Sequence, residues 1–212
     1  MELDEKMVTI LQDRFSLYEN FQLFHQDILK IDLASLIQKE KENNKIEKVK
    51  IVANLPYYIT TPIIMKLLEE ELPLESITVM IQKEVANRLI ALPGEKEAGA
   101  ITYSVYYYAK AQGILEVPKD SFIPMPEVTS KVIKLNLRKE PAVKTKNKEK
   151  LFLVIKSAFM QRRKTLLNAL VNTKIFSSKE EGTKILEQLN LDVTIRPEKL
   201  TLQDYANIEK LL

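Results

Sequence analysis

Four consecutive residues, Asn54-Leu55-Pro56-Tyr57, carry groups suited to methylating an aromatic amine. The N6 amine of adenine is a poor nucleophile because its lone pair is delocalised into the ring, so both N6 hydrogens must be held by acceptors. The Asn54 side-chain oxygen and the Pro56 carbonyl can accept them, since proline restricts the local backbone, and Tyr57 offers a ring face for a base. Taken alone, the tetrapeptide is better explained as a turn between a strand and a helix.

Three further segments carry residue types that fit the same chemistry. Residues 121–130 form a proline-spaced loop in which Phe122 either fills the core or stacks on a base. Residues 80–89 are an apolar strand that turns into a helix. Residues 158–170 have apolar residues at helical spacing, with three consecutive cations on the polar face of the predicted helix.

Positive charge is concentrated in one block of the chain. Residues 131–174 contain thirteen Lys or Arg and two acids, a net charge of +11 in a chain whose total is +3, so the remainder carries −8. A cationic block on an otherwise acidic protein suits the binding of a polyanion. Residues 144–150 also fit a solvated linker, whereas Arg162, Arg163 and Lys164 suit phosphate contacts, because Arg can bind phosphate in bidentate fashion.

The alternation of strand and helix patterns predicts a doubly wound α/β sheet. We expect strands at 1–4, 21–25, 49–53, 77–81, 114–117 and 132–137, and helices at 6–18, 33–39, 61–70, 84–92 and 102–109. The last two strands should pair in antiparallel fashion, and Pro62 should take the first position of its helix. From Asn147 onward only helical patterns occur, so we predict two domains, residues 1–143 and 144–212.

Composition narrows the function classes. The chain has no Cys and one His, which excludes disulfides and a thiolate nucleophile and makes a metal site improbable. It has neither an apolar stretch of membrane-spanning length nor a signal peptide pattern. We therefore expect a cytoplasmic, monomeric protein without a metal.

The four segments together, in this order, resemble the adenine-N6 dimethyltransferases of small-subunit ribosomal RNA, from Glu2 to Leu200. The resemblance implies a class I (Rossmann-like) S-adenosylmethionine methyltransferase sheet and a small all-helical C-terminal domain that binds RNA. It implies dimethylation of two adjacent adenines near the 3′ end of 16S ribosomal RNA, within the small ribosomal subunit. Two alternatives stay open, namely a large-subunit (23S) adenine methylase and a non-catalytic rRNA-binding assembly factor.

The resemblance also implies roles for individual residues. The adenine would contact Asn54, Pro56, Tyr57 and Phe122, and the RNA would contact Arg162, Arg163 and Lys164. S-adenosylmethionine would be bound by Glu2, Asp27, Ile28 and Asn54. From their sequence context alone, Glu2 and Asp27 are more simply explained as acids of a loop or a helix cap.

One expected part of the family pattern is missing from these 212 residues. Family members begin with an RNA-contacting tail and a first strand that ends in a Gly-rich turn, whereas the four glycines here form no Gly-rich loop. The resemblance therefore implies a truncated gene product, a misassigned start or a trimmed chain. We expect this 212-residue chain to be marginally stable and to hold the cofactor weakly, because unpaired buried backbone groups cost about 1–3 kcal/mol each.

Overall fold

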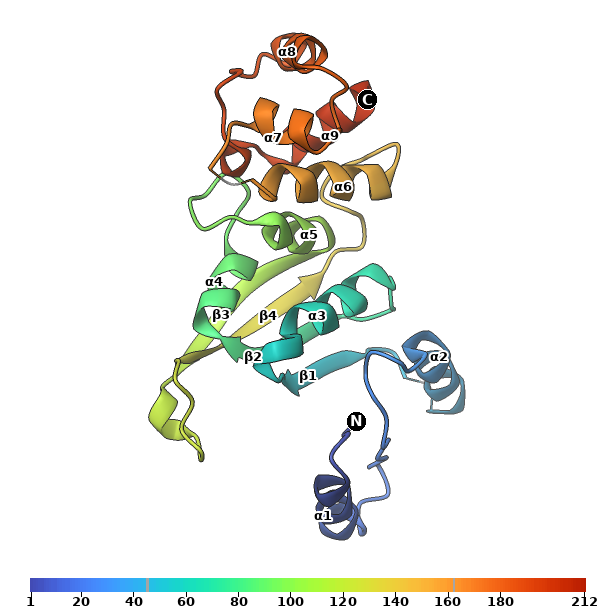
Figure 1. Cartoon of the computed structure of the whole chain (residues 1–212). Helices are drawn as coiled ribbons and strands as arrows, with labels where there is room; N and C mark the ends of the chain where they lie inside the picture. Colours follow the sequence, from blue (N-terminus) through green and yellow to red (C-terminus); the bar gives the residue numbers. More distant parts are fainter. Residues whose placement is uncertain (45, 162) are drawn as a thin grey trace. The chain divides into compact units, whose positions relative to one another are not determined.

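The computed structural model describes residues 1–44, 46–161 and 163–212, and Figure 1 shows its elements. The chain divides into two compact units, one made of Met1–Val49 with Tyr58–Pro73 and the other of Lys50–Tyr57 with Leu74–Leu212. The first unit holds three helices, and the second holds the sheet and the remaining helices.

The first unit is built from α1 (Glu5–Phe15), α2 (Leu33–Asn44) and α3 (Thr60–Glu69). The Asp4 carboxylate caps α1 by accepting a hydrogen bond from the Met7 N–H at 3.0 Å. Helix α3 begins earlier than predicted, so Pro62 occupies its third position. The 3₁₀ turn η1 (Tyr57–Ile59) leads directly into α3, and Pro is tolerated there because the first N–H groups of a helix lack intrahelical partners.

The strands predicted at 1–4 and 21–25 are wrong, because among the described residues that region pairs only through a parallel bridge between Glu2 and His25. The Glu2 N–H donates to the Phe24 carbonyl at 3.1 Å. The Glu2 side-chain Oε1 then accepts the next two backbone N–H groups, those of Leu3 and Asp4, at 2.8 and 3.0 Å. These two N–H groups therefore donate to a side chain and do not continue the strand pairing.

The second unit contains a four-stranded mixed sheet in the order β1-β2-β4-β3. Its strands are β1 (Lys50–Asn54), β2 (Ser76–Gln82), β3 (Ala109–Val117) and β4 (Ser130–Leu137). Strands β1 and β2 are parallel, and β4 is antiparallel to both β2 and β3, which confirms the predicted antiparallel unit. Strand β3 begins five residues before its predicted start, because only the small Ala109 and Ala111 form the apolar positions of its first half and the register shifts after Gly113.

Strand β2 supplies the centre of this sheet. Ile77, Val79 and Ile81 alternate along it and are fully buried, as are Ile133 and Leu135 of β4. Helices α4 (Lys83–Ile90) and α5 (Ala100–Tyr108) follow β2 in the chain, as predicted. Strand β1 differs, because among the described residues it pairs with β2 alone and its Val52 is 80% exposed.

The C-terminal part is helical, as predicted, with α6 (Lys148–Phe159), α7 (Leu166–Asn172), α8 (Lys179–Gln188), the 3₁₀ turn η3 (Pro197–Lys199) and α9 (Leu202–Leu211). The single helix predicted through 158–170 is wrong. Helix α6 ends at Phe159, and the Thr165 hydroxyl starts α7 by accepting from the Asn168 N–H. Arg163 and Lys164 are exposed in this connection, and Arg162 lies outside the described residues.

Aromatic residues join α5 to these helices within the second unit, and Figure 1 shows α6 between α5 and the later helices. The Tyr103 hydroxyl donates to the Leu200 carbonyl at 2.7 Å, and the Tyr205 hydroxyl donates to the Pro197 carbonyl at 2.9 Å. The two rings pack edge to face with centroids 5.0 Å apart. Burial raises the pKa of both tyrosines, so both donate as neutral phenols.

The domain boundary at residues 143 and 144 stays a prediction.

A glycine in α8 generates a test of this packing. A Cβ at Gly182 would lie 2.5 Å from Leu167 Cδ1 and 2.5 Å from Phe176 Cδ2. We expect Gly182→Ala to lower the free energy of unfolding by about 1–3 kcal/mol in urea denaturation, although Gly to Ala usually stabilises a helix. The exposed Lys184→Ala in the same helix is the control and should change it by less than about 0.5 kcal/mol. Stabilisation by Gly182→Ala would contradict the packing.

Candidate active site

Three strands of the second unit bring chemically useful residues to one edge of the sheet. Strands β1 and β2 are parallel, so their carboxyl ends, Asn54 and Gln82, lie at the same edge. Strand β4 runs the other way and begins there, with Ser130 opposite both Gln82 and Val117. Open α/β sheets bind ligands beyond the carboxyl ends of their parallel strands, so a ligand-binding site is expected at this edge.

The segment Asn54-Leu55-Pro56-Tyr57 is fixed at this edge from two sides. The Leu55 N–H donates to the Met80 carbonyl at 3.2 Å, and the Leu55 side chain is buried. The Tyr57 hydroxyl lies 2.7 Å from the Ser130 Oγ, and Ser130 is only 1% exposed. Tyr57 is half-buried, whereas Asn54 is exposed. The contacts of Leu55 and Tyr57 therefore hold the backbone of the segment while the Asn54 amide faces solvent.

Residues 118–129 form a loop, the β3–β4 loop, that leaves and returns at the same edge. It starts after Val117 and ends before Ser130, which face each other in the ladder, and the Lys83 N–H donates to the Thr129 carbonyl at 3.0 Å. Phe122 follows the 3₁₀ turn η2 (Lys119–Ser121) in this loop and is half-buried. It is therefore outside the buried core, which favours the base-stacking role over the core role.

An ion-pair cluster supports the base of the loop. The Lys83 Nζ contacts Glu116 Oε2 at 2.8 Å, and the Lys131 Nζ lies 3.9 Å from Glu116 Oε1 and 3.1 Å from Asn87 Oδ1. The hydrogen bond from Lys83 holds the pKa of Glu116 below its usual value. Sequence reasoning missed this cluster and the anchoring role of Ser130. One sequence signal could have indicated Ser130: it is a polar residue at the first position of an alternating strand, directly after a loop.

Three of the four predicted cofactor residues, Glu2, Asp27 and Ile28, lie in the first unit, whereas Asn54 lies in the second. The bridge between Glu2 and His25 places Glu2 on a strand-like segment parallel to the one that leads to Asp27 and Ile28. Glu2 holds the following turn through Oε1, and Asp27 Oδ1 accepts the Leu29 N–H at 2.9 Å. Carboxylates are acceptors suited to hydroxyl and amine donors of a nucleoside. His25 Nε2 lies 3.1 Å from the Leu3 carbonyl oxygen.

Within residues 1–44, 46–161 and 163–212, no group of three or more His, Cys, Asp or Glu side chains is arranged to hold a metal ion. No helix in the described part of the chain is both long and apolar enough to cross a membrane.

The parallel strands β1 and β2, the helices that follow them and the polar residues at their carboxyl ends are features of a Rossmann-like enzyme. A family model described as "Ribosomal RNA adenine dimethylase" matches residues 1–212. The chain therefore belongs to the ribosomal RNA adenine dimethylase family, a family of methyltransferase enzymes, and the resemblance found in its sequence is confirmed.

Individual relatives agree with this assignment. Proteins named "Ribosomal RNA small subunit methyltransferase A" from Bacillus licheniformis and Alkaliphilus metalliredigens are 46% and 45% identical over 208 and 210 residues. These alignments cover 97% and 99% of this chain and 70% and 72% of the relatives. Their names fit the small-subunit prediction better than the large-subunit alternative.

Solved structures show the same fold. A dimethyladenosine transferase from Plasmodium falciparum matches with a TM-score of 0.75 at 22% identity, covering 97% of this chain and 78% of that one. The 23S rRNA methyltransferase ErmE matches with a TM-score of 0.68 at 18% identity, covering 100% of this chain and 80% of that one. The predicted class I sheet with C-terminal helices is thereby confirmed.

The Tyr57–Ser130 hydrogen bond gives a prediction that does not depend on activity. In a double-mutant cycle of Tyr57→Phe and Ser130→Ala, we expect a coupling free energy of about 0.5–1.5 kcal/mol, measured by urea denaturation. Ser130→Ala alone should be destabilising because it removes the partner of the half-buried Tyr57 hydroxyl. The same cycle on Tyr57 and the exposed Ser177, which belongs to the same unit, should give zero coupling. A zero coupling for Tyr57 and Ser130 would mean that the ring is not held from the β4 side.

Proposed function

We propose that the chain is an S-adenosylmethionine-dependent methyltransferase that converts two adjacent adenines near the 3′ end of 16S ribosomal RNA to N6,N6-dimethyladenine in the small ribosomal subunit. The Tyr57–Ser130 contact of 2.7 Å carries this proposal. This contact joins the segment that begins at Asn54 to β4, the strand that follows the β3–β4 loop. The Asn54 and Pro56 acceptors and the rings of Tyr57 and Phe122 therefore belong to segments that meet at one edge of the sheet. Membership of the family and the names of the relatives support the substrate class.

At the adenine, the roles follow from the chemistry of each group. Unpaired RNA bases can be splayed out and stacked on aromatic rings, and Tyr57 and Phe122 are the rings available at this edge. The Asn54 Oδ1 and the Pro56 carbonyl accept the two N6 hydrogens, which turns the nitrogen lone pair away from the ring. Positive charge develops on N6 as the new bond forms, so these acceptors also stabilise the transition state.

For the cofactor, the acceptors of the first unit fit the donors of a nucleoside. The Glu2 carboxylate suits the two ribose hydroxyls, and the Asp27 carboxylate suits the adenine amine, with Ile28 and Asn54 completing the predicted set. S-adenosylmethionine, when bound, supplies an electrophilic methyl group. The positioning of the amine by Asn54 and Pro56 then provides much of the catalysis.

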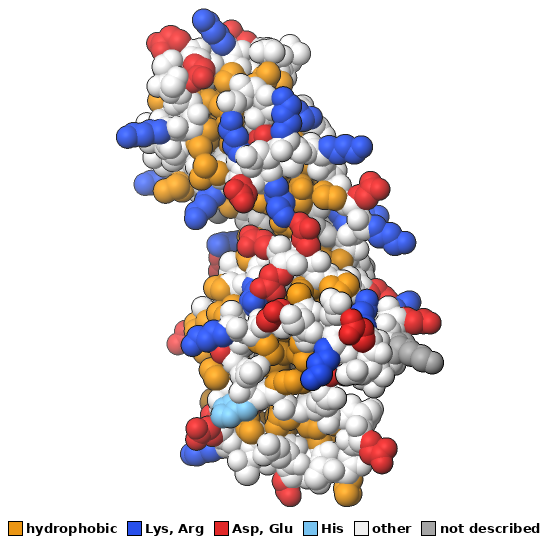
Figure 2. Space-filling view, turned by 90° about the vertical axis from the view of Figure 1, so that its right-hand side faces the viewer, with side chains coloured by type: hydrophobic (Ala, Val, Ile, Leu, Met, Phe, Trp, Pro, Cys, Tyr) orange, Lys and Arg blue, Asp and Glu red, His pale blue; other side chains and the backbone are white. Residues whose placement is uncertain are grey.

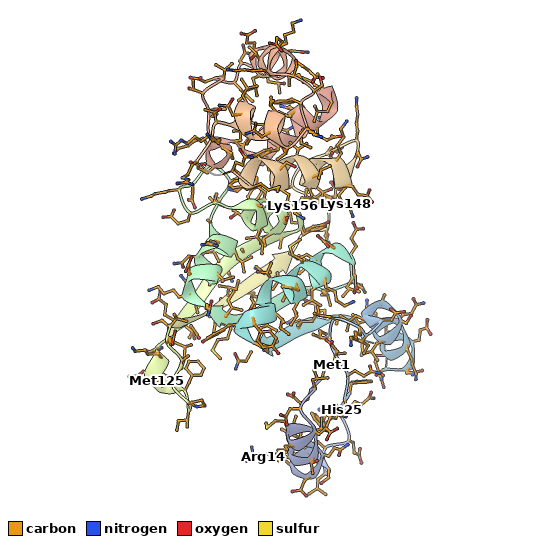
Figure 3. All side chains as sticks on the ribbon, viewed as in Figure 1. Met1, Arg14, His25, Met125, Lys148 and Lys156 are labelled. Atoms are coloured by element: carbon orange, nitrogen blue, oxygen red, sulfur yellow. The ribbon has the colours of Figure 1, made fainter. Side chains whose placement is uncertain are left out.

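The RNA partner would be held by cations of the second unit. Arg163 and Lys164 are exposed between α6 and α7, and Arg162 belongs to the same run of sequence. Helix α6 adds Lys156 and Lys148, whose ammonium also lies over the Tyr108 ring, and Figure 3 labels both lysines. Figure 2 shows Lys and Arg side chains, with some Asp and Glu among them, over the visible face of the C-terminal helices. A surface of this charge suits the phosphate backbone of RNA.

Asn54 provides the direct test of the proposed chemistry. Asn54→Ala should lower methyl transfer to undermethylated small ribosomal subunits by about 100-fold in a radiolabelled assay, because it removes a contact that strengthens in the transition state. RNA affinity should hardly change. The exposed Asn43→Ala serves as the matched control and should retain full activity. Normal methylation by the Asn54 variant would remove Asn54 from the proposed mechanism.

The cations give a second test. Arg163→Gln with Lys164→Gln should weaken binding to the 16S RNA and flatten the log–log salt dependence of the association constant by about 1.5. Lys179→Gln with Lys184→Gln removes the same charge from α8, beside two glutamates, and should leave the slope unchanged. Equal slopes for the two double variants in a filter-binding titration would show that Arg163 and Lys164 do not contact the RNA.

A further inference from the structure

The β3–β4 loop presents apolar side chains to solvent. Ile123 is 102% exposed and Met125 is 60% exposed, and Figure 3 places Met125 in the loop that projects from the end of the β3–β4 ribbon. Val128, at the end of the same loop, is exposed as well. Exposed apolar groups that cluster in one segment usually mark a binding surface, because water gains entropy when they are covered.

The loop is also restrained by its own sequence. Pro118, Pro124 and Pro126 limit its backbone, and the Ser121 N–H donates to the Pro118 carbonyl at 3.1 Å. Its return is held through the Thr129 carbonyl, which accepts from the Lys83 N–H. A restrained segment loses little conformational entropy when it binds, so these apolar side chains are presented ready for contact.

The position of the loop indicates what it contacts. Ile123 directly follows Phe122, and both ends of the loop lie at the sheet edge where Asn54 lies. An RNA whose adenine reaches Asn54 must bring its neighbouring nucleotides to this loop. The faces of stacked bases are apolar, and Ile, Met and Pro are residue types that enter base steps as wedges. The exposed Lys119, in the same loop, suits an adjacent phosphate.

We propose that Ile123 and Met125 form a wedge that enters the RNA base stack beside the target adenine and holds that adenine unstacked. The proposal rests on the proposed function and adds a role for residues that do not touch the reacting amine. A wedge of this kind would lower the stacking that the adenine must lose before it can reach Tyr57 and Phe122. A protein contact on the same loop is the competing explanation, and the test separates the two.

The test uses the full 212-residue chain with Ile123→Ser and Met125→Ser combined. Its RNA is a synthetic strand in which 2-aminopurine replaces one of two adjacent adenines that follow a base-paired step. Unstacking of 2-aminopurine raises its fluorescence, so the readout needs neither the cofactor nor methyl transfer. The control combines Leu17→Ser and Leu153→Ser, which make the same chemical change at exposed positions elsewhere.

We expect wild type and control to raise the fluorescence at saturating protein, and the wedge variant to lower the unstacked fraction by about 10-fold. The salt slope of its binding should equal that of wild type, because no cation is removed. A full fluorescence rise with the variant, at any affinity, would overturn the wedge. The wedge would also be overturned if the variant raised the fluorescence of this RNA as much as wild type but bound assembled small subunits more weakly. That result would favour a protein contact of the loop. Failure of wild type itself to bind the RNA would instead overturn the proposed function, and the wedge with it.

Discussion

The candidate site depends on strand β2 being hydrogen-bonded on both sides, in parallel to β1 and in antiparallel to β4. This arrangement alone places the end of β1, the end of β2 and the start of β4 at one edge. Side chains alternate along a strand, so a slip of one residue would turn Ser130 away from Tyr57. The burial of Ile77, Val79 and Ile81 opposes such a slip, because it would expose all three side chains together.

The site joins fixed anchors to exposed functional groups. Leu55 and Ser130 are buried, whereas the side chain of Asn54 is exposed and Phe122 is half-buried. The buried neighbours hold the backbone, so the exposed groups keep their direction without being packed themselves. Such an arrangement lets a base enter without displacing core residues, and it lowers the entropy that binding would otherwise remove.

The sequence predicted the parts of the fold that local patterns determine. Strand β4 and helix α5 follow from their apolar spacing, whereas the first half of β3 was missed because alanines form its apolar positions and a register shift follows Gly113. The helix predicted through Arg163 failed because the cap at Thr165 favours a new helix over a continuous one. In the candidate site, Asn54 and Tyr57 were predicted from chemistry and stay predictions, but the partner of Tyr57 lies 73 residues away in the chain, and no local pattern encodes that contact.

A non-catalytic RNA-binding factor would need only the cations and the aromatic rings. Its stability would be served equally by many residues at the position of Asn54, because that side chain is exposed and adds nothing to the buried core. The residue that packs is Leu55, next to it. The proposed acceptance of hydrogens from an amine gives an amide at the carboxyl end of a strand, beside an anchored Tyr57, a specific use. The placement of Asn54 thus favours transfer chemistry over simple binding.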